Sequence, residues 1–339
     1  MDVASHGFKA PVHWFVASLF ALLPRGVSAQ SCQTLNDMET PIRTTITNAA
    51  QRYFEMAVKG DIASIRQNAI PSLVADFGGI EATVKSHEQN LAISKATLKA
   101  AFLLNAMETS PNQHAEFYCG VFGKNGQTTE SAVFYFDSLP SGRYAVVLLD
   151  ATSPQSRTMF SEVLQQIGSD WEVGGLYVKS AQVAGHDSDW FLARARDYKA
   201  KGQLHNSWLY FEQIMDLASR GMRFMSTLTT DRLYDEKQTV QPSDLPANGK
   251  TVDLVAGATT YKLSAVYPWM IGNDLDLLVK HKVADASDSN QMYQDNIALI
   301  KTLIAKYPEF REAFSGVEAV AVDSSGRDYG TLLAMKDAK

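Results

Sequence analysis

The densest group of residues able to do chemistry lies at 185–190, where the chain reads GHDSDW. An imidazole and two carboxylates this close together could bind a metal or exchange protons. The same residues also suit the start of a helix, because Asp187 or Ser188 can accept backbone N–H bonds there. We expect the helix start, and we keep His186, Asp187 and Asp189 as candidate ligand-binding residues.

Patterns typical of motif-bearing enzymes are missing. The sequence has no Gly-x-Ser-x-Gly, His-Glu-x-x-His, paired Cys-x-x-Cys or calcium-loop pattern. Residues 120–125 lack the spacing and the Ser or Thr of a phosphate loop. His281 shares a strand face with Leu277 and Val279, which favours a core or sheet-edge histidine over a ligand. We therefore predict no metal site and no cofactor.

The first 29 residues have the layout of a cleavable secretory signal. Lys9 precedes an apolar run at 14–23, which is too short to span a bilayer, and small residues at 27–29 offer a cleavage site after Ala29. The alternative is a buried N-terminal helix. We predict an exported protein, periplasmic or extracellular, with no integral membrane segment after cleavage.

The charge of the predicted mature chain limits its partners. Removing residues 1–29 takes away Lys9, Arg25 and Asp2 from 31 basic and 37 acidic residues, leaving 29 and 36 and a net charge of −7. That acidic surplus predicts no nucleic-acid partner. The remaining length, about 310 residues, favours two domains.

The chain has two cysteines, Cys32 just after the predicted cleavage site and Cys119 in a strand-like run. An oxidising compartment would allow them to form a bond. We hypothesise a disulfide between Cys32 and Cys119. The alternative is a buried Cys119 with Cys32 free on a mobile tail.

The periodicity after residue 41 changes from helix to strand near His114. Gly60 ends the first predicted helix, and Asp61 caps a second. Strands are predicted at 116–123, 131–138, 144–149, 159–167 and 171–179, with a hairpin turn at Asn125-Gly126. The fold class predicted is α+β, with helices packed on one face of an antiparallel meander. The apolar face of the first helix holds Ile42, Ile46, Ala49, Ala50, Tyr53, Phe54 and Ala57.

Two segments of this half resemble a known superfamily. Residues 57–63, AVKGDIA, and 171–178, WEVGGLYV, are similar to the NTF2-like superfamily, a cone-shaped α+β fold, over roughly residues 41–180. The resemblance implies a curved antiparallel sheet that wraps helices around a pocket. The superfamily includes isomerases, dehydratases and non-enzymatic binding or delivery domains.

In isomerases of that superfamily, a carboxylate and a tyrosine in a dry pocket carry proton transfer. Strand alternation places Tyr135 and Asp137 on one face with Val133, so these two are candidate catalytic residues if that face lines a pocket. The alternative, which we expect, is a solvated outer face with Phe134 and Phe136 turned to the core.

The rest of the chain divides into two further units. Residues 187–220 resemble one tetratricopeptide-type helix pair around Gly202, which predicts a helical hairpin connector at 181–224 packed on its neighbours. A second α+β domain is predicted at 225–339, after a first domain at 30–180. Its strands are expected at 251–256, 260–267, 274–283, 317–322 and 329–335, and Asp288 or Ser289 is expected to cap a helix that runs to Tyr307.

Three functions fit these features. The leading hypothesis is an exported, non-catalytic protein that binds a small apolar ligand or an envelope protein partner. The alternative is a small-molecule isomerase or lyase using an NTF2-like pocket. A third is a structural module whose helix hairpin docks another protein, which predicts that Trp190, Trp208 and Tyr210 are exposed.

Overall fold

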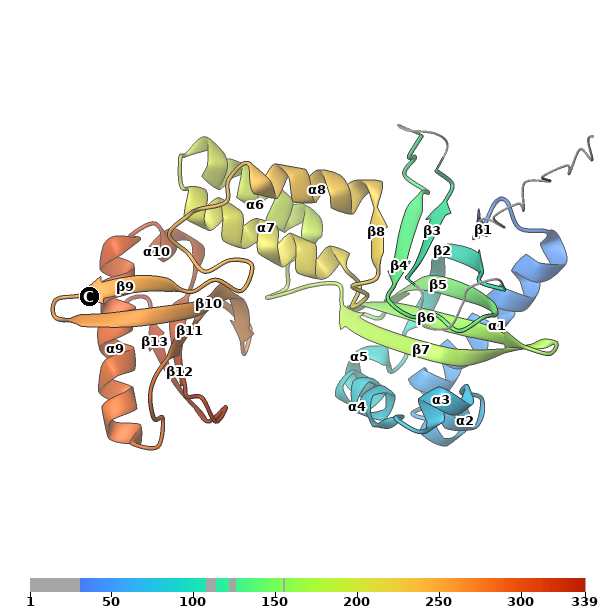
Figure 1. Cartoon of the computed structure of the whole chain (residues 1–339), viewed down its shortest axis with the longest axis horizontal. Coiled ribbons are helices and arrows are strands. Elements are labelled where there is room, and N and C mark those ends of the chain that lie inside the picture. The colour runs from blue at the N-terminus through green and yellow to red at the C-terminus, as the bar shows by residue number, and fades with distance from the viewer. Residues whose placement is uncertain (1–30, 108–113, 122–125, 155, 339) are drawn as a thin grey trace, which may run out of the picture.

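Five helices in the first half of the described chain lie on one face of a sheet (Figure 1). The computed structural model describes residues 31–107, 114–121, 126–154 and 156–338, so the predicted signal at 1–29 and Asn125 of the predicted hairpin turn lie outside it. Its helices and strands have the predicted α+β class. The first five helices are α1 (Thr40–Val58), α2 (Ile62–Gln67), α3 (Pro71–Val74), α4 (Gly78–Ser86) and α5 (Glu88–Leu91).

Helix α1 packs on the sheet through the apolar side chains that repeat along one of its faces. Six of its seven predicted apolar positions are buried, from Ile46 to Ala57, and only Ile42 is partly exposed. Gly60, with a φ of 66°, ends the turn that follows. Asp61 then caps α2 as predicted, because its carboxylate accepts the backbone N–H of Ser64 at 3.1 Å.

The helices cover a five-stranded antiparallel sheet in the order β1-β2-β5-β6-β7. Side chains of β6 point to both faces of the sheet and so belong to two hydrophobic cores. Phe160 and Leu164 pack under the helices, whereas Val163 packs on the opposite face. The strands are β1 (Ser31–Thr34), β2 (Lys95–Asn105), β5 (Arg143–Thr152), β6 (Arg157–Ile167) and β7 (Asp170–Ser180).

The opposite face of this sheet carries a small second sheet. It consists of β3 (Ala115–Cys119), β4 (Ala132–Phe136) and β8 (Met225–Thr227), in the order β3-β4-β8. The prediction of one continuous meander is therefore wrong for β3 and β4. The cause is burial, because Phe117 and Phe134 point from this hairpin into a core with Phe102 of β2.

The predicted disulfide is confirmed. Cys32 of β1 is bonded to Cys119 at the end of β3, with Cα atoms 4.9 Å apart. The bond joins the five-stranded sheet to the three-stranded sheet near one edge.

The helix hairpin consists of α6 (Ser188–Ala200) and α7 (Leu204–Ala218), followed by α8 (Leu228–Gln238). Gly202, with a φ of 76°, makes the turn between α6 and α7. The hairpin shares one hydrophobic core with the C-terminal sheet, since Phe211 and Ile214 of α7 belong to the same cluster as Leu277 and Val279.

The C-terminal sheet has the order β13-β12-β11-β10-β9, with α9 (Ser289–Lys306) and the short α10 (Phe310–Ala313) between β11 and β12. Strands β11 and β12 are parallel, and the other pairs are antiparallel. Strand β9 pairs only with residues 259–263 of β10, whereas residues 265–271 pair with β11 alone among the described strands. The strands are β9 (Val252–Ala256), β10 (Thr259–Ile271), β11 (Asp274–Lys282), β12 (Gly316–Val322) and β13 (Asp328–Ala334).

Polar contacts at the ends of the helix hairpin tie the two halves together. Arg220, just after α7, donates to the Asp150 carboxylate at 2.8 Å, the Leu149 carbonyl at 2.7 Å and the Ser161 hydroxyl at 3.3 Å. Beside it, Arg157 of β6 lies 3.2 Å from the Asp187 carboxylate at the start of α6, and all four of these charged residues line one cavity.

Candidate ligand groove between α7 and β10

A groove of about 480 Å³ lies where α7 passes the second half of β10. Its walls are Glu212, Gln213 and Asp216 of α7, residues 267–270 of β10, and Val183 from the loop before α6. The volume falls within the usual range for small-ligand sites.

The β10 side of the groove is apolar and open to solvent. Trp269 is 48% exposed and Met270 is 46% exposed, and Tyr267 meets Trp269 edge to face with ring centroids 6.3 Å apart. Adjacent large apolar side chains that remain exposed are typical of a surface that another molecule covers.

The α7 side of the groove is polar. Gln213 is 6% exposed as a whole residue and lines the groove. Glu212 pairs with Lys237 at 2.8 Å and Asp216 with Lys179 at 2.6 Å, but both lysines lie outside the lining. The groove thus presents an amide that can donate and accept, between two carboxylates that each keep a second oxygen for a ligand.

The comparisons supply no relative. Nothing among known protein families, curated proteins or solved structures matches this chain. Across the residues that the structure describes, no helix combines the length and apolar character that crossing a membrane requires. The same residues include no group of three His, Cys, Asp or Glu side chains placed to hold a metal.

The structure separates the residues of the 185–190 segment. Asp187 caps α6 by accepting the backbone N–H of Trp190 at 3.1 Å, which confirms the expected helix start. His186 stacks on Trp190, with ring centroids 3.7 Å apart, and lines a polar cavity of about 330 Å³ beside Arg194. Asp187 and Asp189 instead line another cavity, of about 280 Å³. These candidates therefore do not form one site.

Tyr135 and Asp137 lie on the outside of the small sheet. Tyr135 is 40% exposed, and the Asp137 side chain is fully exposed near His114. Phe134 is buried, and Phe136 stacks on Phe224. This is the solvated face that we expected as the alternative, and neither candidate lines a cavity described here.

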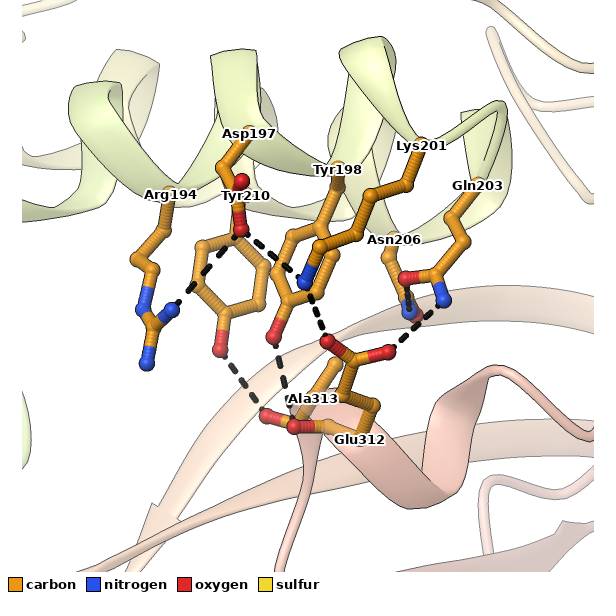
Figure 2. A network of polar contacts seen from close by, with 9 residues as sticks. All are labelled: Arg194, Asp197, Tyr198, Lys201, Gln203, Asn206, Tyr210, Glu312 and Ala313. Atoms are coloured by element: carbon orange, nitrogen blue, oxygen red, sulfur yellow. Dashed lines mark hydrogen bonds and ion pairs between the residues drawn. The ribbon is translucent and has the colours of Figure 1, made fainter.

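The aromatic residues of the helix hairpin serve its packing. Trp208 and Tyr210 are 3% and 2% exposed, so the prediction of exposed docking residues is wrong for both, and Trp190 is only partly buried. Figure 2 shows the reason: the hydroxyls of Tyr198 and Tyr210 donate to the carbonyls of Glu312 and Ala313 in α10, at 3.3 and 2.9 Å.

Sequence reasoning missed Glu162 of β6. It is fully buried in the core under the helices, and neither carboxylate oxygen has a partner among the described residues. Burial raises the pKa of this carboxyl well above 4.5. Nearby Tyr53, whose pKa is also raised by burial, donates its hydroxyl to the Trp171 carbonyl at 2.7 Å. The detectable signal was a glutamate alternating with Phe160 and Leu164.

His281 is the core histidine that the sequence favoured. It is 1% exposed, and its Nε2 lies 2.7 Å from the Asn296 Oδ1 of α9, while its Nδ1 has no partner among the described residues. Burial lowers the pKa of His281, so the neutral imidazole is the form that this site holds. We assign it to packing between β11 and α9.

Proposed function

We propose that this chain is an exported, non-catalytic binding protein that takes an apolar ligand, a small molecule or part of an envelope protein, in the α7–β10 groove. The observation that carries the proposal is a groove in which exposed Trp269 and Met270 face the polar side chain of Gln213. Export is supported by the signal-like layout of residues 1–29 and by the disulfide between Cys32 and Cys119. An NTF2-like assignment of residues 41–180 remains part of this proposal.

The groove offers affinity and selectivity from different walls. Each 100 Å² of apolar surface that a ligand covers on Trp269 and Met270 contributes about 2.5 kcal/mol before the costs of association. Gln213 adds selectivity, because its amide can donate to and accept from one polar group of the ligand. A ligand with an apolar body and one hydrogen-bonding group fits both walls.

The test is native mass spectrometry of the protein purified from its host envelope. We expect wild type to carry a bound molecule and the Trp269→Ala variant to lose at least nine-tenths of it. Leu332→Ala on β13 is the matched control, because Leu332 is 49% exposed at the opposite edge of the same sheet. Equal retention by Trp269→Ala, or no retention by any form, would count against the groove.

One observation favours the second candidate, an isomerase or lyase in the first half of the chain. Glu162 and Tyr53 are a carboxylic acid and a phenol inside the sheet–helix core, both with a pKa raised by burial. Perturbed pairs of this kind occur at proton-transfer sites. Neither group lines any of the four cavities described here, which is why the binding function ranks first. Retained substrate turnover in a Glu162→Gln variant would exclude this role.

A further inference from the structure

The groove runs along an open strand edge. Successive side chains of a strand point to opposite faces of its sheet, yet residues 267, 268, 269 and 270 all line the groove. Side chains from both faces of a strand can border one cavity when that cavity follows the edge of the strand. This is the stretch of β10 that pairs with β11 on one side and with no described strand on the other.

An open edge carries its own binding groups. Alternate residues of such a strand direct their backbone N–H and C=O away from the sheet, where an extended chain can pair with them. Pro268 has no N–H, and a proline within a sheet belongs at an edge. Its position in the middle of residues 265–271 agrees with an outward-facing backbone there.

We propose that the ligand of the α7–β10 groove is an extended polypeptide segment of a partner protein that adds to the open edge of β10 as a further strand. This inference rests on the proposed function and specifies its ligand. Main-chain hydrogen bonds to β10 supply the common part of the affinity, and alternate side chains of the segment meet different walls. One set lies against Tyr267 and Trp269, and the other faces α7.

The charges of the groove indicate which segment fits. Glu212 and Asp216 line it, and the lysines that pair with them are not among its lining residues. A segment in which apolar residues alternate with Lys or Arg places cations against these carboxylates. The same charges disfavour a second copy of this chain, because two β10 edges side by side would bring the acidic walls of two grooves together.

The experiment is a calorimetric titration with synthetic eight-residue peptides. The probe is VKVKVKVK with blocked ends, and the controls are VEVEVEVE and a VKVKVKVK peptide N-methylated at alternate amides. We expect the probe to bind wild type and Leu332→Ala alike, and to bind Trp269→Ala at least tenfold more weakly. Both control peptides should also bind wild type at least tenfold more weakly.

A neutral apolar dye, N-phenyl-1-naphthylamine, separates the inference from the function on which it rests. If wild type bound the dye but not the peptide, and Trp269→Ala lost dye binding, the groove would stand as a ligand site and strand addition would be overturned. Equal binding of the N-methylated peptide would overturn it too. If wild type bound neither the peptide nor the dye, both proposals would be wrong. If wild type formed a concentration-dependent dimer that Trp269→Ala disrupted, the edge would be assigned to a second copy of the chain.

Discussion

Glu162 shows how one side chain can set the pH response of a domain. Its cross-strand neighbours are Val147 and Leu176, both buried in the same apolar core. A carboxylate there would lose its hydration without gaining a hydrogen bond, so the protonated acid is the form that the core tolerates. The unfolded chain, in contrast, ionises this group at its ordinary pKa of 4.5.

We predict that Glu162 makes a contribution to stability that falls as pH rises above 4.5. In that range the folded state keeps a proton that the unfolded state has lost, so this contribution to the free energy of unfolding falls by about 1.4 kcal/mol per pH unit until the raised pKa is reached. Urea denaturation between pH 4 and 8 measures this slope. Glu162→Gln should remove the contribution, and Glu172→Gln, on neighbouring β7, is the control. An unchanged slope in Glu162→Gln would contradict the assignment.

Single residues differ in how far the sequence predicts them. Asp61 and Asp187 act on backbone three residues away, so local patterns sufficed to predict both caps. The environment of Glu162 is set by elements distant in sequence, so no local pattern reveals that its carboxylate has no partner among the described residues. Tyr135 at the end of β4 and Asp137 just after it are exposed, because β4 belongs to the small sheet and turns Phe134 to the core instead.

At the scale of elements, the helix hairpin is held to α10 by two kinds of contact (Figure 2). The Tyr210 hydroxyl, in a side chain 2% exposed, donates to the Ala313 carbonyl at 2.9 Å. Lys201 and Gln203 reach the exposed carboxylate of Glu312 at the surface. The buried contact should contribute more, because water and salt do not screen it.

We predict that Tyr210→Phe lowers the free energy of unfolding by about 1–3 kcal/mol, since the Ala313 carbonyl is left without its donor. Glu312→Gln should cost less than about 1 kcal/mol. Guanidinium denaturation of both variants measures the difference. A larger loss in Glu312→Gln would mean that the surface pair dominates.

The sequence predicted the bounds of the strands better than it predicted which strands pair. Every strand expected after residue 250 is present within a few residues of its predicted bounds, because alternation is a local property. The separate pairing of β3 and β4 with β8 was missed, since β8 lies about 90 residues further along. The open edge of β10 was missed for a similar reason: it depends on how soon β9 ends.

At the scale of the molecule, Arg220 connects the two halves. Its side chain is 12% exposed and bonds to β5 and β6 through three groups. The residue has a φ of 51°, a left-handed conformation that costs energy outside glycine, so its contacts must outweigh that cost.

We predict that Arg220→Met separates the unfolding of the halves. Loss of the charged hydrogen bonds should lower stability by about 2–3 kcal/mol and turn one calorimetric transition into two. Arg157→Met is the control, because that guanidinium is 57% exposed and its single ion pair contributes about 1 kcal/mol or less. One undivided transition at the wild-type midpoint would refute the prediction.

The disulfide also constrains how the chain matures. Cys32 and Cys119 are the only cysteines of this chain, so an intramolecular bond has one possible connectivity. Oxidation cannot trap a scrambled isomer within the molecule, so exchange with one disulfide-bearing oxidant suffices. The two cysteines are 87 positions apart, so during synthesis the Cys32 thiol has no intramolecular partner until β3 has been made. If the chain is exported as we propose, slow export would expose Cys32 to mixed disulfides with other proteins.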